Sequence, residues 1–513
     1  MNSETRTATD VLIVGAGPTG LTLACDLARR GVKFRIIDKV ATYFVGSRGK
    51  GLQPRSLEVF DDLGIIEKIL AHGRFHLPFR GYDGATVLGD RDLNEGRHAT
   101  PNVPYASSLI IPQWRVEEIL RDKLSQSGSY VELATELVNI EQDELSVTAT
   151  LSHENTTEQV RTRYLVAADG GKSFVRKHFN IDFEGETWKD ERMLVGDVQV
   201  DVLDRDHWHS WPKHEGGWVA LCPLPSTNTF QFQAQIPPDE PDEPSLERFQ
   251  QIIDERTGRP DIKLHDATWL SLYRANIRMV DRYRVGGVFL AGDAAHVHSP
   301  AGGQGMNTGI QDAYNLGWKL GAVLSTEPAT LLDTYEEERL PIAAWLLGVT
   351  TKLHRQILQG TANTQRDPEL LQLGLNYRGS SLTEDAANPS TTLQAGDRAP
   401  DAPLVDLEGK TVRLFDTFRG PKFTLLSFGS DNATAIAELS RRYESILNAY
   451  QIIRPNTSDS RTINKLIDEQ GHAFSAYGIE SDATFLIRPD GYIGFIGRGE
   501  PSTSIDNYIK RIG

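Results

Sequence analysis

The strongest constraint on the fold is a glycine-rich turn close to the N-terminus. An apolar strand over Val11–Val14 leads into Gly15-x-Gly17-x-x-Gly20, and a helix and a second strand follow. In a dinucleotide-binding βαβ unit the first glycine permits a tight turn, the second lets backbone approach a pyrophosphate, and the third lets helix and strand pack closely. Asp38 ends the second strand, where it can accept hydrogen bonds from a ribose. This stretch predicts an α/β domain that binds a dinucleotide.

The helix after the turn supplies the groups that would bind phosphate. Its first turn offers backbone N–H groups and the positive end of the helix dipole. A plain structural βαβ turn is the alternative, but strand, turn, helix, strand and terminal acid all occur in register. The residues that we predict to contact the dinucleotide here are Gly15, Gly17, Pro18, Thr19, Gly20, Asp38 and Lys39.

Composition limits what else the chain can be. Its 513 residues suggest about three domains. A share of 39% apolar and 24% charged residues is ordinary for a globular protein. The formal net charge of −16 argues against nucleic acid or an anionic membrane as partner. No apolar run approaches a membrane span and the N-terminus is too polar for a signal peptide, so we expect a cytoplasmic protein.

Cysteine and histidine usage predicts no metal site. The chain has only Cys25 and Cys222, too few for a disulfide framework or a cysteine zinc site. Cys25 falls within the first helix, where a buried thiol is the simplest interpretation. Two pairs of histidines at alternate positions lack the further ligands that zinc needs, so we interpret them as packing or surface residues. These pairs are His207 with His209 and His296 with His298.

Two later segments look like parts of the same domain. Tyr164–Lys177 is an apolar strand that runs into an Asp-Gly pair at Asp169, and in isolation it is an ordinary strand-to-helix turn. Val285–Leu316 is more specific, because a strand ends at Gly292-Asp293 and the glycine-rich loop Gly302–Gly305 then opens a helix. The loop lacks the Lys-Ser/Thr of a triphosphate-binding P-loop. Its bare helix N-terminus suits a flat ring that carries partial negative charge.

Taken together and in this order, GAGPTG, the Asp-Gly pair at Asp169 and GDAAH…P-x-GGQGMN resemble the group A flavoprotein aromatic hydroxylases, of the para-hydroxybenzoate and phenol hydroxylase type. The resemblance extends from Val11 to about Leu340, and Ser47–Ile65 also looks like the segment after the second strand in this family. The last motif is the most specific of the three. The resemblance implies an α/β fold, in which a Rossmann-like FAD-binding domain carries an inserted antiparallel substrate sheet.

The resemblance gives each motif a role. It implies that the early glycines hold the FAD pyrophosphate and that Asp38, where glutamate is commoner, holds the adenosine ribose. Arg48 and Gln113 would lie along the phosphates and the ribityl chain, and Asp293 would accept from ribityl hydroxyls. Asp169 resembles a position that handles FAD and NAD(P)H. The other residues implied to contact FAD, most of them beside the flavin ring, are Gly292, Pro300, Gly303, Gly305, Met306 and Asn307.

The resemblance also implies the chemistry. NAD(P)H docks transiently and reduces the flavin, O₂ adds at C4a, and the hydroperoxide transfers oxygen to an electron-rich ring. One dinucleotide fingerprint fits transient docking, but it does not separate NADH from NADPH. The substrate would be a phenolic or polycyclic aromatic compound. An FAD oxidase or dehydrogenase on the same fold is the alternative. A non-enzymatic relative is a third reading, against which the intact Gly302–Asn307 loop argues.

The order of the motifs predicts the domain plan. Residues 1–181 and 271–358 should form the FAD-binding domain, and residues 182–270 the substrate sheet, with 75–105 contributing to it. Alternating stretches such as Thr229–Ile236 favour strands that face a core on one side. No catalytic base stands out. The candidates for the substrate pocket, for which packing is the alternative role, are Tyr105, Trp211 and His214.

The C-terminal quarter predicts a separate unit. Residues 359–392 are polar and lack a pattern, which indicates a linker, and residues 393–513 resemble the thioredoxin-like domain of phenol and polyketide hydroxylases. The positions after the strand that ends at Phe428 are Gly429–Asn432, which hold no cysteine. Without a thiol pair there is no thiol–disulfide exchange, so we expect a scaffolding role or a contact in a homodimer.

Overall fold

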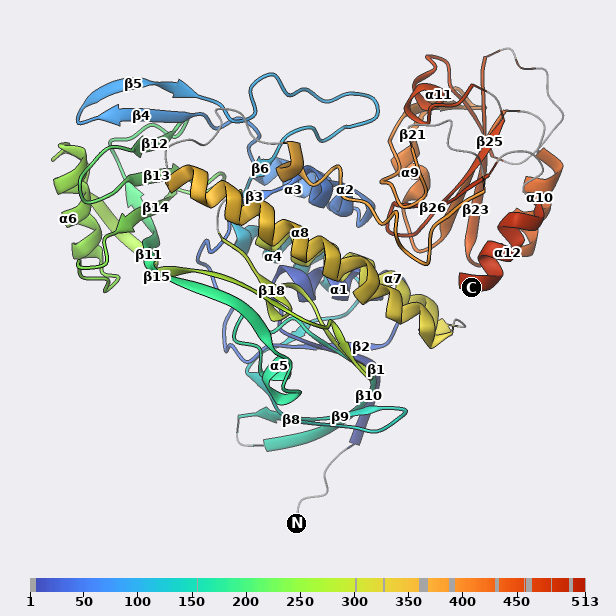
Figure 1. Ribbon diagram of the computed structural model, residues 1–513, viewed down its shortest axis with the longest axis horizontal. Coiled ribbons are helices and arrows are strands. Elements are labelled where there is room, and N and C mark those ends of the chain that lie inside the picture. Colours follow the sequence, from blue (N-terminus) through green and yellow to red (C-terminus); the bar gives the residue numbers. More distant parts are fainter. Residues whose placement is uncertain are drawn as a thin grey trace.

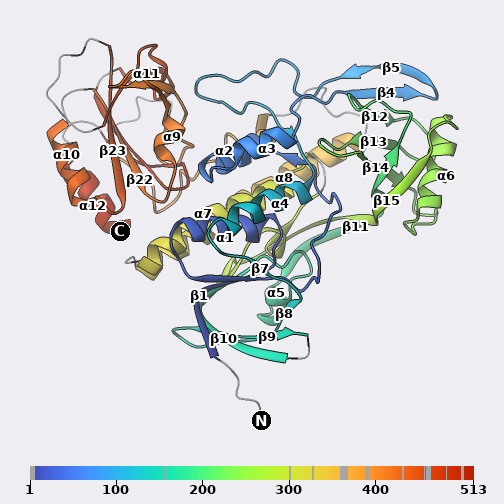
Figure 2. The same ribbon diagram turned by 180° about the vertical axis from the view of Figure 1, so that it is seen from behind.

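The computed structural model describes residues 6–154, 156–299, 302–325, 328–358, 368–386, 393–429, 433–455, 457, 464–480, 482–497 and 502–512. A central domain with a mostly parallel sheet carries a layer of helices. A second sheet lies at one end of this layer and a third sheet at the other (Figure 1), and the view from behind shows the same arrangement (Figure 2). The N-terminal strand enters the central sheet, as the early βαβ motif predicts.

The central sheet runs in the order β16-β17-β10-β1-β2-β7. Strands β17, β10, β1, β2 and β7 are parallel, and β8 and β9 extend the start of β10 as antiparallel strands. The apolar run Val11–Val14 is buried, as expected of a parallel strand that is covered on both faces. The strands are β1 (Arg6–Val14), β2 (Phe34–Ile37), β7 (Val131–Glu132), β8 (Thr135–Gln142), β9 (Val147–His153), β10 (Thr156–Ala167), β16 (Arg284–Val285) and β17 (Val288–Leu290).

A stripe of small residues on α7 lets α1 pack against it closely. A Cβ added at Gly309 would lie 2.4 Å from Thr19 Oγ1, and one at Gly317 would lie 2.3 Å from Asp26 Oδ2. Residues four apart share a helix face, so these glycines bring the early and late motifs side by side. The helices of this domain are α1 (Pro18–Arg29), α2 (Pro54–Asp62), α3 (Ile66–His72), α4 (Gln113–Ser125), α5 (Phe174–His178), α7 (Gly305–Ser325) and α8 (Asp333–Leu358), with the 3₁₀ turns η1 (Gly292–Ala294) and η2 (Ala329–Leu332) and the short strands β3 (Gly51–Leu52) and β6 (Leu109–Ile110).

The second sheet runs β18-β15-β11-β14-β13-β12-β4-β5. Its outer face packs on α6 (Leu246–Thr257), where Phe232 and Phe249 stack at 4.2 Å. Strands β4 and β5 come from residues 75–105, and β15 continues past the boundary we expected at residue 270. The strands are β4 (Phe79–Asp83), β5 (Thr86–Arg91), β11 (Phe183–Val200), β12 (Trp208–Trp211), β13 (Val219–Pro223), β14 (Thr229–Ile236), β15 (Leu264–Val280) and β18 (His296–Val297).

The third sheet, in the order β19-β26-β25-β22-β23-β24-β20-β21, forms the C-terminal domain. Its centre has parallel β22 and β23 joined through α10, then the β25–β26 hairpin and α12. The elements are β19 (Glu384–Asp385), β20 (Pro403–Asp406), β21 (Thr411–Arg413), β22 (Phe423–Phe428), β23 (Leu447–Ile453), β24 (Lys465–Ile467), β25 (Ala483–Ile487), β26 (Ile493–Gly497), α9 (Leu414–Phe418), α10 (Ala433–Arg442), α11 (His472–Ala476), α12 (Ser502–Ile512) and the 3₁₀ turn η3 (Pro368–Leu371).

Residues 368–386 differ from the linker that their polar sequence indicated. Leu371 and Tyr377 are buried, and β19 adds a parallel strand to β26 of the third sheet. Tertiary contacts, which a local pattern does not reveal, therefore hold this stretch against both neighbouring domains. Positions 430–432, part of the segment in which we noted the missing cysteines, lie outside the described residues.

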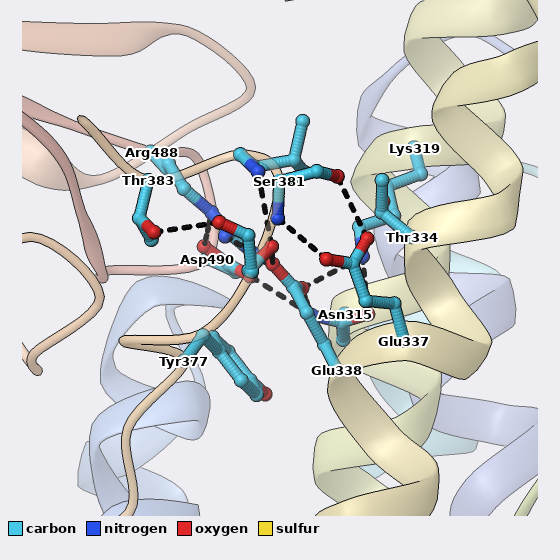
Figure 3. A network of polar contacts seen from close by, with 12 residues as sticks. Asn315, Lys319, Thr334, Glu337, Glu338, Tyr377, Ser381, Thr383, Arg488 and Asp490 are labelled. Carbon is cyan, nitrogen blue, oxygen red and sulfur yellow. Dashed lines mark hydrogen bonds and ion pairs between the residues drawn. The ribbon is translucent and has the colours of Figure 1, made fainter.

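A buried ionic network joins the C-terminal domain to α7 and α8 (Figure 3). Arg488 donates to both oxygens of Glu338, at 2.6 and 2.9 Å, and to Asp490 Oδ2 at 2.6 Å. Lys319 Nζ also donates to Glu338, at 2.7 Å. The network holds two acids and two bases, so its charges balance in a setting where an unpaired charge would be costly. The domain is thus a packed part of the molecule.

Both cysteines of the chain lie in the protein interior. Cys25 and Cys222 are buried and free, and burial raises the pKa of each thiol to about 12, which is typical of unreactive packing residues. Within the ranges given above, no three potential metal ligands come together, and no helix is long and apolar enough to cross a bilayer.

Candidate active site

Backbone atoms crowd the early glycine turn at Gly15 and Gly20, whereas the turn is open at Gly17. Gly15 has φ +103°, and a Cβ there would lie 2.3 Å from the Ala168 carbonyl oxygen. A Cβ at Gly20 would lie 2.0 Å from the Gly15 oxygen, whereas one at Gly17 would meet nothing within 4 Å. Helix α1 begins at Pro18 without a side-chain cap, so its first amides face the open space. The turn therefore offers the bare, positive cradle that a pyrophosphate requires.

Asp38 lies directly over this turn. Its Oδ2 accepts from the Ala16 amide at 2.9 Å and its Oδ1 from the Val40 amide at 3.1 Å, and the side chain is half-buried. These contacts orient the carboxylate and leave further lone pairs for a ribose. Lys39 is exposed beside it. Thr19 contributes only backbone here, because its side chain fills the space between α1 and Gly292.

Charged groups from three segments meet between the two glycine turns. The Gln113 amide donates to the Gly49 oxygen at 2.9 Å, and Gln113 Nε2 donates to Glu117 at 2.9 Å. Burial raises the pKa of Glu117, and the positive charge of Arg48 counters that rise. Asp293 is exposed, yet desolvation by the protein around it raises the pKa of its carboxyl, and the charges of His296 and then Arg48 counter that rise. An exposed group that is still desolvated lies in a recess of the surface.

Asp169 has an unused oxygen. Its Oδ2 accepts from the Phe174 amide at 2.7 Å and so caps α5, but its buried Oδ1 has no hydrogen-bond partner among the described residues. Burial raises the pKa of this carboxyl. Arg176 spans the neighbouring turns, donating to the carbonyls of Gly171 at 2.7 Å and Ala294 at 2.8 Å.

The late glycine loop leads into α7. Gly303 is exposed with φ +64°, and a Cβ at Gly305 would meet nothing within 4 Å. Asn307 faces the protein instead: its Oδ1 accepts from the Gln53 amide at 2.7 Å and its Nδ2 donates to the carbonyls of Gly51 and Gly303, each at 2.9 Å. Asn307 is therefore a brace for the loop. Met306 packs on the central core, and Pro300 lies outside the described residues.

Two groups that support these turns were missing from the sequence prediction. Gln53 Nε2 donates to the carbonyls of Gly302 at 3.0 Å and Gly303 at 3.3 Å. Asp312 accepts from the Gly292 amide at 3.0 Å, from His296 Nε2 at 2.6 Å and from Arg339 Nε at 2.7 Å. Both lie far in sequence from their partners. The regular four-residue spacing within helices gives no sign of such contacts.

The inner face of the second sheet turns toward these motifs. Asp197 pairs with Gln231 on one side and with Trp269 on the other, in one row across β14, β11 and β15. The segment after β2 lies on this row, because the Ser47 amide donates to Asp197 Oδ2 at 2.7 Å and Lys50 Nζ donates to Gln231. The sequence prediction did not include these four polar residues.

The three candidates for the substrate pocket, Tyr105, Trp211 and His214, lie away from the row of Asp197 and Gln231 on the inner face of the second sheet. Tyr105 OH donates to Asp61 at 2.8 Å, beside the C-terminal domain, and Trp211 is buried against Tyr82 in the core that faces α6. His214 is exposed in a turn. Strand alternation turns Trp211 to the outer face of the sheet, where it packs in the core that faces α6.

Comparison with known proteins identifies this architecture. A family model described as an FAD binding domain matches residues 8–349. A flavin-dependent monooxygenase of Mycobacteroides abscessus is 44% identical over 98% of this chain and 99% of its own length. The chain belongs to the group A FAD-dependent aromatic hydroxylases. A 6-methylpretetramide 4-monooxygenase of Streptomyces rimosus is 33% identical over 98% of this chain and 93% of its own. Aklavinone-11 hydroxylase, solved with FAD and aklavinone, is 26% identical with a TM-score of 0.85 over 100% of this chain and 99% of that one.

The residues of this chain fit the cofactor of the family. The open space in front of Gly17, the uncapped start of α1 and the unpartnered Asp169 Oδ1 are features that a bound FAD accounts for. When bound, FAD supplies the activation of O₂ and the transfer of an oxygen atom. The protein supplies position, charge and exclusion of water.

Proposed function

We propose that this hydroxylase acts on a phenolic or polycyclic aromatic compound that binds over the inner face of the second sheet. The relatives named above include enzymes of polycyclic substrates. The supporting observation is a row that holds three polar side chains, next to the row held by Ser47 and Lys50. Across the strands this row holds Ser210, Ala220, Gln233, Val195 and Ser271.

This row has free hydrogen-bonding capacity. The side chains of Ser210, Gln233 and Ser271 make no hydrogen bond within the described residues and are each partly exposed. On the far side of the row, Tyr273 OH donates to the His298 oxygen at 3.4 Å. A flat substrate over the row would thus lie between two places where the sheet contacts the FAD domain, the Ser47–Asp197 hydrogen bond and the Tyr273–His298 hydrogen bond. The polar side chains of the row would orient its oxygen atoms.

We assign cofactor contacts on the geometry given above. Gly15, Gly17, Gly20 and the start of α1 would hold the pyrophosphate, and Asp38 the ribose. Arg48, Gln113 and Asp293 would follow the chain toward Gly303 and Gly305. Asn307 and Thr19 would act through the backbone that they position. NAD(P)H as the reductant, a cytoplasmic location and a homodimer also belong to this proposal, and light scattering of the purified protein tests the dimer.

One experiment tests the reaction. The purified, FAD-loaded protein is given NAD(P)H, labelled ¹⁸O₂ and a series of phenols from one to four rings. We expect aromatic-stimulated NAD(P)H oxidation and one labelled oxygen atom in the product. An oxidised product without label, with peroxide formed in equal amount, would support the oxidase alternative instead.

A variant pair tests the substrate position. Gln233→Ala should raise KM for the aromatic substrate by roughly tenfold, because one or two hydrogen bonds are lost, while the visible flavin spectrum stays unchanged. Gln251→Ala, an exposed glutamine of α6 on the outer face, is the matched control. Equal KM values for the two variants would contradict the placement.

A further inference from the structure

The segment after α8 contacts the late glycine loop directly. Leu370 and Leu371 are buried, and the Leu370 carbonyl accepts from Gln304 Nε2 at 2.9 Å. A Cβ at Gly302 would lie only 3.0 Å from Leu370 Cδ2. The loop that opens α7 therefore rests on residues more than sixty positions later in the chain.

Gln372 is the centre of this contact. Its Nε2 donates to Gln304 Oε1 at 2.7 Å, and its Oε1 accepts from Gln311 Nε2 at 2.5 Å. Gln304 in turn donates to the Gly302 carbonyl at 2.8 Å. All three glutamines are nearly or fully buried. Removing the Gln372 amide would leave buried polar groups on the loop and on α7 without a partner, which is costly.

The backbone of Gln372 is held in an unfavourable conformation. Its φ of +62° lies in the left-handed region, which a non-glycine residue with a long side chain rarely adopts. Such strain persists only where surrounding contacts hold it. Here the backbone is held by the hydrogen bond from the Gln372 amide to the Glu369 carbonyl at 3.2 Å, and the side chain by Gln304 and Gln311.

The same segment also reaches the Gly292 turn. Tyr377 OH accepts from Arg339 Nη1 at 3.0 Å, and Arg339 binds Asp312, which accepts from the Gly292 amide. At its other end the Tyr377 amide donates to the Gly396 carbonyl at 2.8 Å, within the C-terminal domain. One stretch therefore joins both late turns of the FAD site to the C-terminal domain.

We propose that Gln372 is a positioning residue for the flavin. Its Nε2 holds Gln304, which donates to the Gly302 carbonyl and so orients the peptide between Gly302 and Gly303. Its Oε1 holds Gln311 on α7, the helix that the loop opens. This loop would border the flavin. In this way a residue outside the FAD-binding motifs tunes how tightly and in which orientation FAD is held.

The test uses full-length Gln372→Gly. Glycine accepts the left-handed backbone, so the variant should fold, and the whole Gln372 side chain with its amide is removed. We expect FAD affinity, measured by titration of the apoprotein, to fall roughly tenfold, as loss of one to two net hydrogen bonds would give. We also expect a shifted visible flavin spectrum and a larger share of NAD(P)H oxidation that ends as peroxide.

Two controls separate positioning from general stability. Glu154→Gly relieves a similar positive φ of +52° at an exposed turn of β9 and should leave spectrum and affinity unchanged. In a Gln304→Ala background the further change Gln372→Gly should have little added effect, since the two act as one unit. Unchanged FAD affinity and spectrum in a folded Gln372→Gly, or fully additive effects with Gln304→Ala, would overturn the proposal.

Discussion

The early glycine turn at Gly15 is closed by backbone atoms, whereas the late loop at Gly303 is held by side chains, some of them from distant segments. The early turn meets the backbone of Ala168 and of its own residues. The late loop depends on Gln53, Asn307 and Gln304, the last of which rests on the segment before the C-terminal domain. A short motif encodes the glycines that the first kind of turn requires, although Ala168, which closes it, directly follows a distant strand. The second kind exists only once the domains have packed.

The largest expected effect tests whether the C-terminal domain supports the late half of the site. Arg488→Met would leave Glu338 and Asp490 buried without their guanidinium partner, and should lower the free energy of unfolding by about 3–5 kcal/mol. Denaturant unfolding of the FAD-loaded protein measures this. Arg441→Met, an exposed arginine of α10, is the control and should change little. An equally stable Arg488→Met would mean that the network is dispensable.

Next in size is the steric test of the early turn. Gly15→Ala places a Cβ 2.3 Å from a backbone oxygen that has no freedom to move. The strain of about 1–3 kcal/mol, together with the clash, should weaken FAD binding by up to roughly 100-fold. Gly31→Ala, at φ +70° with nothing within 4 Å of the new Cβ, carries the strain without the clash and should retain FAD. Equal loss in both would remove the steric argument.

Asn307→Ala tests the polar brace of the late loop. Three hydrogen bonds are lost, one of them buried and two partly buried, so the free energy of unfolding should fall by about 2 kcal/mol and the visible flavin spectrum should change. Asn139→Ala, a partly exposed asparagine of β8, serves as the control in the same assays. If stability fell and the flavin spectrum stayed the same, Asn307 would stabilise the loop without changing the environment of the flavin.

The smallest effect concerns the attachment of the segment after β2 to the second sheet. Burial raises the pKa of Asp197 from 3.8 to about 6, so its ionised form is disfavoured in the fold. Stability from this group is present at low pH and is lost as pH rises through that value. Asp197→Asn, which can still accept from the Ser47 amide, should therefore gain about 1 kcal/mol more at pH 8 than at pH 5. Thermal unfolding at both pH values measures the difference, and a pH-independent gain would contradict it.

Strand and helix patterning predicted most of the central domain. The run Val11–Val14 with its glycines specified the βαβ unit, since those residues act on neighbours within a few positions. Alternation in Thr229–Ile236 likewise predicted a strand with one apolar face. Alternation did not say which face of the sheet packs on a helix, because the core that faces α6 holds aromatic residues such as Trp211 and Phe232.

The sequence alone determined the family and the cofactor, because turns and helix starts that bind FAD are encoded in short stretches of glycine and acid. Only the tertiary structure decided what holds the late loop and which polar residues of the second sheet contact the segment after β2. Sequence patterns assigned no role of their own to Gln53, Asp197 and Gln372, and each acts on a segment far away in the chain. A hydrogen bond between such distant groups depends on how whole domains pack, which no local pattern records.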